Sequence, residues 1–315
     1  MSTETESVLD EPRGGAWISA RPTRSREVLQ RLVRLPWLVF ENWDLVRTTL
    51  LRDLSARFQG TILGWAWPIL QPLVMFGIYF FIFTELLQQK IRELPPELKA
   101  LMGVYMFCAM VPWSALSESL ARGTSVIVDN GNLIKKLVFP SELLPLNTVL
   151  ASLTMMLFGV GIFVLATLFT PVWPRNGPLY WVPALVVVQG LFIYGLVLFF
   201  STLQVFLRDT VQIVGMANTV WMFLTPVFWV PELLGKDFER HLPLIHANPA
   251  YHMVSAWRAT LMGDVIVPAG DRVMRPVVVA DIPGHLGILA LWALGTYALG
   301  FTFFVFSQRR FADEV

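Results

Sequence analysis

Residues 176–207 read NGPLYWVPALVVVQGLFIYGLVLFFSTLQVFL and contain no charged side chain. A helix needs about 20 apolar residues to cross the hydrocarbon core of a bilayer, so this stretch is long enough for one membrane-spanning helix. Five further charge-free stretches of sufficient length occur, at 59–84, 100–117, 143–174, 210–231 and 282–308. The sequence therefore predicts an all-α integral membrane protein with six transmembrane helices, at roughly 62–87, 100–119, 143–169, 180–206, 210–230 and 285–307.

The composition of the 315-residue chain agrees with a membrane protein. Hydrophobic residues make up 55% and charged residues only 15%, whereas soluble domains average about 25% charged residues. This apolar excess excludes a disordered chain, and a net charge of +1 offers no general electrostatic reason for nucleic-acid binding. The one cysteine, Cys108, excludes an intramolecular disulfide, and the four histidines lack the spacing of a metal site.

The chain divides into three regions. Residues 1–35 are predicted to form a polar cytoplasmic tail, residues 36–60 an amphipathic interfacial helix and residues 61–310 the six-helix domain. An even number of spans places both termini on one side of the membrane. That side would carry 15 Lys and Arg against 9 on the other, and the positive-inside rule therefore favours cytoplasmic termini.

The predicted interfacial helix has an apolar stripe at helical spacing. The stripe consists of Val39, Trp43, Val46, Leu50 and Leu54, with steps of three or four residues. Charged residues lie mostly off this stripe, which is typical of a helix lying in the membrane interface. A helix packed against a protein neighbour is the alternative interpretation.

The loop at 129–142, between the second and third spans, contains a short amphipathic segment. Asn132 is predicted to cap a helix that Pro140 ends. Leu133, Ile134 and Leu137 would share one side of this helix, with the lysines on the other. Such a helix could fit a groove in a partner protein or lie on the membrane surface with its lysines on anionic headgroups. The residues alone do not separate these two roles.

Two segments later in the chain also interrupt the apolar pattern. Arg208 and Asp209 predict a tight cytoplasmic hairpin between the fourth and fifth spans. In 232–283, Asn248 followed by proline predicts a helix start, and Gly263 predicts its end. Fourteen residues are too few to cross a bilayer, so this helix is predicted to be interfacial or re-entrant.

The sequence contains no feature that would power transport. It has no G-x-x-x-x-G-K-[ST] motif for binding a nucleotide. Acidic residues deep in the spans, which mark ion-coupled transporters, are also lacking. A membrane enzyme such as a glycan polymerase or acyltransferase would need a catalytic acid, base or nucleophile in a cavity, and no convincing set occurs. The residues therefore indicate a chain that can form a path through the membrane but shows no means of powering it, and we predict that it is not an enzyme.

Several of these segments, in this order, resemble the membrane subunit of ABC-2 type exporters of polysaccharides and polyol phosphates, the group that serves O-antigen, capsule and teichoic-acid export. The resemblance spans about residues 40–308. It is carried by the following stretches: 51–60 running into 63–72, 132–145, Phe206-Leu207-Arg208-Asp209, Leu224-Thr225-Pro226-Val227-Phe228, and Asn248-Pro249 with Arg258 and Gly263.

The resemblance implies a homodimer that works with two copies of a separate ATPase subunit in the bacterial cytoplasmic (inner) membrane. The ATPase would bind ATP and Mg, and this chain would bind no cofactor or metal of its own. The substrate would be a lipid-linked glycan, and export of a small amphipathic drug or lipid is the alternative. The residues implied in coupling to the ATPase are Asn132, Leu133, Ile134, Lys135, Lys136, Leu137, Phe139, Glu142, Arg52, Asp53 and Arg57.

The resemblance also implies that the glycan path lies between the two membrane subunits, lined largely by the first and fifth spans of each. Aromatic rings suit such a path because their faces can stack on sugar rings. The candidates are Phe76, Tyr79, Trp221, Phe223 and Phe228. The segment 232–263 would form two short re-entrant helices on the exit side.

Overall fold

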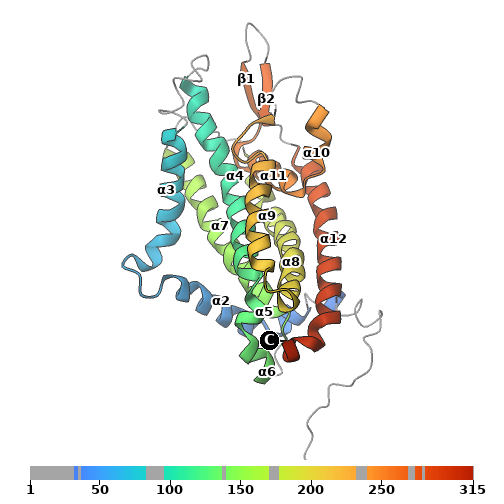
Figure 1. Cartoon of the computed structure of the whole chain (residues 1–315). Helices are drawn as coiled ribbons and strands as arrows, with labels where there is room; N and C mark the ends of the chain where they lie inside the picture. Colours follow the sequence, from blue (N-terminus) through green and yellow to red (C-terminus); the bar gives the residue numbers. More distant parts are fainter. Residues whose placement is uncertain are drawn as a thin grey trace, which may run out of the picture.

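The structure is a computed structural model, and it describes residues 32–34, 37–82, 96–136, 140–169, 177–231, 240–268, 274–278 and 281–314. These residues form a bundle of long helices (Figure 1). In the described part, three helices are long and apolar enough to cross a membrane: α7 (Leu143–Phe169), α8 (Val182–Phe206) and α12 (Ile282–Ser307). The predicted all-α membrane class is confirmed.

Three more helices run along the bundle: α3 (Trp67–Phe81), α4 (Pro96–Gly123) and α9 (Thr210–Leu224). The helices α3 and α9 are apolar but shorter than α7, α8 and α12. Our predicted fifth span, 210–230, is too long, because the helix stops at Leu224. Thr225 has an extended backbone, with φ −92° and ψ 136°. The cause is Pro226, since proline disfavours the helical conformation of the residue before it.

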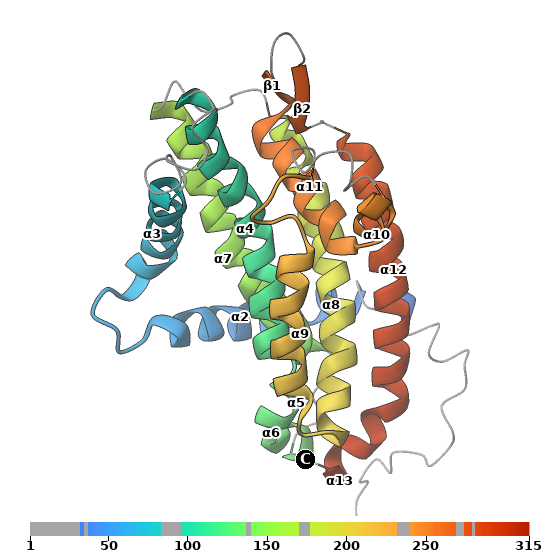
Figure 2. The same cartoon turned by 45° about the horizontal axis from the view of Figure 1, so that its top comes forward.

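The helix α2 (Trp43–Phe58) crosses the bundle (Figure 2). Shorter helices lie toward its two ends: α5 (Val126–Asp129), α6 (Gly131–Lys136), α10 (Leu242–His246), α11 (Pro249–Met262) and α13 (Phe311–Glu314). The predicted ends of α11 are confirmed. The Asn248 side chain accepts a hydrogen bond from the backbone of Ala250, and Gly263 adopts φ +69°, a left-handed value that glycine tolerates.

A small antiparallel hairpin adds a feature that our all-α prediction lacks. The strands β1 (Val265–Pro268) and β2 (Met274–Val278) pair within a segment that the sequence left unassigned. The hairpin lies at the opposite end of the molecule from α6 and the C-terminus (Figure 1). We call these two ends the hairpin end and the α6 end.

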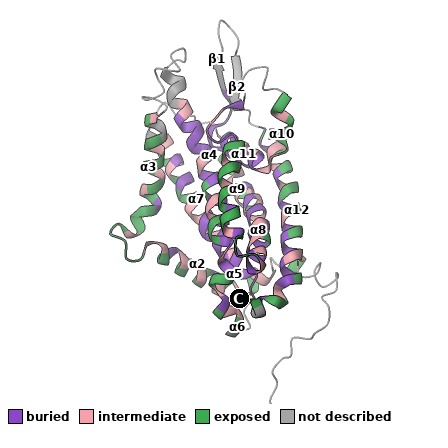
Figure 3. Cartoon of the chain, viewed as in Figure 1, coloured by how far each residue is buried: buried purple, intermediate pink, exposed green. Residues whose placement is uncertain are grey.

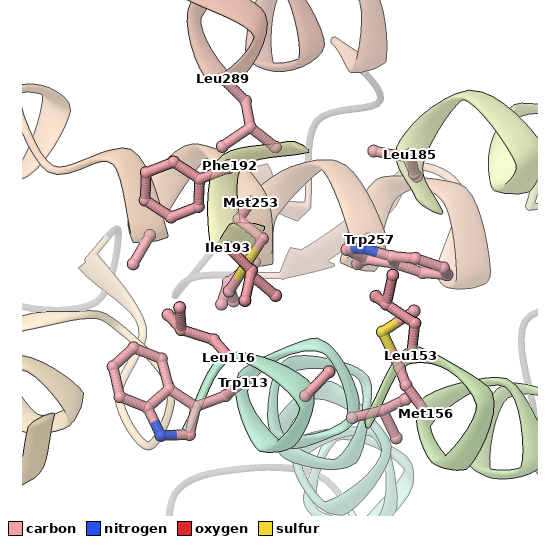
Figure 4. Close-up of a cluster of buried hydrophobic side chains, with 14 of the residues drawn as sticks. Trp113, Leu116, Leu153, Met156, Leu185, Phe192, Ile193, Met253, Trp257 and Leu289 are labelled. Carbon is pink, nitrogen blue, oxygen red and sulfur yellow. The ribbon is translucent and has the colours of Figure 1, made fainter. Parts of the chain in front are cut away.

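The core surrounds α11 at the hairpin half of the bundle. Met253 and Trp257 of α11 are fully buried. Apolar side chains of α4, α7, α8 and α12 surround them (Figure 4). Apolar side chains on the outside of the bundle stay exposed, for example Leu291 at 70% and Leu299 at 72%, and the outer surfaces of α3 and α9 are also exposed (Figure 3). Such exposure is typical of helices that face lipid or another membrane subunit.

The helices α8 and α12 approach most closely where two glycines face each other. A Cβ atom on Gly195 would collide with the backbone of Thr296 and Tyr297, and one on Gly300 would collide with the Gly195 carbonyl oxygen. Small residues allow this backbone contact between membrane helices, and the van der Waals contact stabilises their pairing.

We therefore expect Gly195→Val to separate α8 from α12. The free energy of unfolding should fall by about 1–3 kcal/mol, because overpacking forces the two backbones apart. The midpoint of thermal unfolding in detergent measures this loss. Gly295→Val is the matched control, since a Cβ atom there meets nothing within 4 Å. Equal midpoints for the two variants would contradict the assigned contact.

Candidate coupling and translocation surfaces

Helix α2 lies across the bundle and contacts α7 with its apolar stripe. Val46 and Leu54 are buried, and the side chain of Asn147 in α7 donates a hydrogen bond of 2.5 Å to the Thr49 hydroxyl. Trp43, which we assigned to the same stripe, is 55% exposed and faces outward. The stripe thus packs on the chain's own bundle, and the exposed side of α2 carries Trp43 and Leu51 among polar and charged residues.

An ion-paired cluster joins the end of α2 to α4. The Arg57 guanidinium is 5% exposed, lies 2.5 Å from the Glu118 carboxylate and 3.4 Å from that of Asp53. Arg122 lies 3.5 Å from the same Glu118 carboxylate. Three α2 residues were implied in coupling. Arg52 is exposed, Asp53 pairs with Arg57, and the Arg57 side chain is held inside the chain. Arg57 therefore connects two helices of one subunit.

Replacing Arg57 with methionine should loosen α2 from α4. The buried guanidinium would be lost and Glu118 would lose its shortest contact, which we expect to cost about 1–3 kcal/mol. Amide hydrogen exchange across α2 is the measurement, and protection of 43–58 should fall. Arg52→Met, an exposed change on the same helix, should leave protection unchanged. Equal amide protection of α2 in the two variants would contradict the assigned role of Arg57 in joining α2 to α4.

The segment predicted to couple to an ATPase, 129–142, contains the short helix α6, which follows directly after α5 (Figure 1). The side chains of Asn132 and Lys135 are exposed, and those of Leu133 and Ile134 are half-buried. This arrangement agrees with an apolar side against the bundle and a polar side outward. Leu137 and Phe139, together with the Lys136 side chain, lie outside the described residues.

The predicted cap at Asn132 is wrong. Helix α6 begins one residue earlier, at Gly131. The backbone amides of Leu133 and Ile134 donate to the carbonyl oxygen of Asn130, while the Asn130 side chain donates to the carbonyl oxygen of Val126 in α5. Because α5 directly precedes α6, α6 needs no side-chain cap of its own at Asn132.

The far end of the loop is fixed inside the bundle. Gln308, after α12, donates a 2.8 Å hydrogen bond to the Ser141 hydroxyl, and the Tyr194 hydroxyl of α8 donates to the carbonyl oxygen of Glu142. Glu142 is 7% exposed, so it belongs to this fixed end and not to the exposed side of α6. Ser141 and Glu142 are therefore anchored to α8 and to the end of α12.

The turn between α8 and α9 contains Arg208 and Asp209, both exposed. Gln204 closes this turn from the last residues of α8. Its amide donates to the carbonyl oxygen of Arg208 at 3.1 Å and accepts from the amide of Val211 at 3.0 Å. The charged pair thus occupies a tight hairpin at the α6 end, as the sequence predicted.

The candidate path residues fall into two groups. Phe76 packs edge-on against the buried Phe107 of α4, and the Trp221 indole packs edge-on against Trp113 and Phe192. These two rings therefore belong to the packing of the bundle. Phe223 is 62% exposed and contacts the half-buried Phe228. The side chain of Tyr79 lies outside the described residues.

Helix α9 carries an exposed apolar surface that includes Phe223. Its members recur every three or four residues and are Ile213, Met216, Val220, Phe223 and Leu224. Helix α3 has a similar exposed set: Ile69, Leu73, Val74, Met75, Ile78 and Phe81. These are the first and fifth predicted spans, whose outer surfaces can meet lipid or a second membrane subunit.

Polar side chains connect α11 to α4, α8 and the end of α9. Arg258, 3% exposed, donates to the carbonyl oxygen and hydroxyl of Tyr105 in α4 and to the carbonyl oxygen of Val227. Its guanidinium also lies 3.5 Å from the centre of the Tyr105 ring. Gln189 of α8 accepts a 2.6 Å hydrogen bond from the Trp257 indole.

Further contacts of this kind involve α9. Asn248 accepts from the Trp221 indole at 2.8 Å and donates to the Thr225 hydroxyl at 2.9 Å. Closer to the α6 end, Asn218 of α9 donates to the Ser117 hydroxyl of α4 at 2.7 Å. These hydrogen bonds between helices were not predicted from the sequence. Polar residues within the apolar stretches were the signal that could have indicated them.

The fold and these surfaces define a membrane-embedded helical protein with short helices projecting at one end and buried polar links between its long helices. The model of the ABC-2 type transporter family matches residues 44–262, and the chain belongs to this family. A permease protein of an O-antigen export system from Myxococcus xanthus is 25% identical over 286 residues, covering 90% of this chain and 100% of that protein. Two permease proteins of the same designation from Klebsiella pneumoniae are 25% identical over 224 residues, covering 71% of this chain and 82% of each relative.

Proposed function

We propose that this chain is the membrane subunit of an ATP-driven exporter that moves a lipid-linked polysaccharide across the bacterial cytoplasmic membrane. The observation that carries the proposal is the match along the whole length of the Myxococcus O-antigen export permease. The glycan would be of the O-antigen, capsule or teichoic-acid kind.

In the proposed topology, α3, α4, α7, α8, α9 and α12 form six spans. The α6 end then faces the cytoplasm, with both termini on that side. The excess of Lys and Arg in the loops and tails of this side supports the assignment. The hairpin end, with α10 and α11, faces outward, which gives the predicted re-entrant pair its place at the exit.

The α6 end would be the docking surface for a separate ATPase subunit that binds ATP and Mg. The exposed side of α6 with Lys135 supports this role. The chain on the α5 side of α6 is fixed by the hydrogen bond from Asn130 to Val126, so a movement of α6 can pass to α5. Two copies of each subunit would form the complete transporter.

Helix α4 provides a connection from the docking surface to the proposed path. It leads into α5 and α6, and it is linked to α2 through Glu118, to α9 through Ser117 and to α11 through Tyr105. A displacement of α6 would therefore shift α4 and the helices attached to it. The exposed surfaces of α3 and α9 in two facing subunits would separate and open a path, with Phe223 available for stacking on sugars.

Depletion of this chain from the native bacterium tests the proposed substrate. A glycan exporter predicts that carrier-linked glycan accumulates in the cytoplasm and that surface glycan disappears. An exporter of small amphipathic drugs or lipids predicts no glycan accumulation and a gain in drug sensitivity or an altered lipid distribution. That second result would overturn the polysaccharide assignment while leaving the transporter family intact.

A further inference from the structure

The four histidines of the chain all lie toward the hairpin end. His241 precedes α10, His246 is in α10, His252 is in α11 and His285 is in the first turn of α12. Three of them surround the ring of Tyr251. The centroid distances from the Tyr251 ring are 5.2 Å to His246, 5.1 Å to His252 and 5.5 Å to His285.

Two of these imidazoles are directly hydrogen-bonded and join α11 to α12. The Nδ1 atoms of His252 and His285 are 2.9 Å apart, and Nε2 of His252 lies 2.7 Å from the carbonyl oxygen of His246. A carbonyl oxygen can only accept, so Nε2 of His252 carries a proton. In the neutral imidazole, Nδ1 of His252 is then an acceptor, and Nδ1–H of His285 must be the donor.

This arrangement tolerates one added proton but not two. A neutral imidazole can carry its proton on either nitrogen, so in a singly charged pair one Nδ1–H still donates to the other Nδ1. When both imidazoles are charged, every ring nitrogen carries a proton. Two N–H groups then face each other across 2.9 Å, and the hydrogen bond between α11 and α12 becomes a repulsion.

The surroundings of the pair contain few charges among the described residues. The groups that act on it are His246 from α10 and Asp281 at the N-terminus of α12, with the neutral Tyr251 ring between. Asp281 is occupied in capping α12, because its carboxylate accepts from the amide of Gly284. Burial lowers the pKa of His252 below its ordinary value, so His252 is neutral at pH 7 and charges only in acid.

We propose that the His252–His285 contact is a pH-sensitive link, closed at neutral pH and opened when acid outside the cell protonates both imidazoles. Opening would loosen α10 and the first turn of α11 from α12 at the hairpin end, while the rest of α11 stays packed in the core. This link is independent of the transported substrate, since it needs only the two helices and access of protons to this end of the molecule.

Distance measurement between two spin labels tests the link in the full chain in lipid nanodiscs. Leu244→Cys in α10 and Leu291→Cys in α12 place labels at positions that are 74% and 70% exposed, while the native Cys108 is buried. From about pH 7.5 to about pH 4, a second distance population should appear. The same distribution at both pH values would overturn the proposal.

Two variants remove the titration while keeping a hydrogen-bond donor. The amide of His285→Asn can replace the Nδ1–H donor, and that of His252→Gln can donate to the carbonyl oxygen of His246. Each should keep one distance population at both pH values. His241→Asn, at an exposed position before α10, should respond like the unmodified protein. A full acid response in both pair variants would also contradict the link.

Discussion

Charge reversal at Lys135 and Lys136 is expected to abolish binding of the ATPase subunit and, with it, export. The two residues lie in α6, and the Lys135 side chain is exposed at the α6 end. Like charges brought together across an interface cost several kcal/mol, and about 1.4 kcal/mol corresponds to a tenfold change in affinity. We expect co-purification of the ATPase with the Lys135→Glu, Lys136→Glu protein to fall by at least about 100-fold.

The control for this experiment is Arg240→Glu. Arg240 is exposed next to α10 at the other end of the molecule, where the proposed topology allows no contact with the ATPase. This variant should bind the ATPase and export glycan normally. If the double lysine variant also retained binding and export, α6 would not be the docking surface, and the interpretation of α6 as a helix resting on anionic headgroups would be favoured.

Replacing Arg258 with methionine is expected to be the most destabilising of the single polar changes. The side chain is 3% exposed and bonds to Tyr105 and to the carbonyl oxygen of Val227. Each buried acceptor left without a donor costs about 1–3 kcal/mol, so the loss should reach about 2–5 kcal/mol. The midpoint of thermal unfolding in detergent checks this value.

Two further variants sharpen this prediction. Arg258→Lys keeps the charge, but its compact ammonium cannot reproduce the fork of donors that reaches both α4 and the segment after α9. Its midpoint of thermal unfolding should therefore lie between those of the unmodified protein and of Arg258→Met. Arg122→Met removes an arginine of α4 that is 49% exposed, and it should lie within about 0.5 kcal/mol of the unmodified protein. A stable Arg258→Met protein would show that the buried links do not hold α11.

The long helices could be predicted from the sequence because their cause is local. The absence of charge over 176–207 already requires a helix, since unpaired backbone groups are too costly in lipid. The ends of α11 were predictable for the same reason, because Asn248 and Gly263 act on neighbouring backbone atoms. Pro226 is an equally local signal, because proline disfavours a helical conformation of the residue before it, and it accounts for the end of α9 at Leu224, short of the predicted end at 230.

The contacts between helices could not be predicted in this way. The position of Arg57 in the sequence indicates an exposed cation on an amphipathic helix, yet Glu118, 61 positions later, buries it in an ion pair. Trp43 fits the apolar stripe by spacing, but its side chain is 55% exposed and does not share the burial of Val46 and Leu54. Both outcomes depend on how distant segments pack, and spacing within one helix carries no information about that packing.

The most direct test of the proposed function is export in a reconstituted membrane. Proteoliposomes would contain the chain together with its ATPase subunit, with a carrier-linked glycan placed on the ATPase side. We predict that the glycan becomes accessible to a glycosidase on the opposite side only when both subunits and ATP are present, and that Lys135→Glu with Lys136→Glu prevents this. Glycan that stays on its original side while ATP drives the movement of a fluorescent amphipathic lipid would contradict the assignment of a polysaccharide exporter.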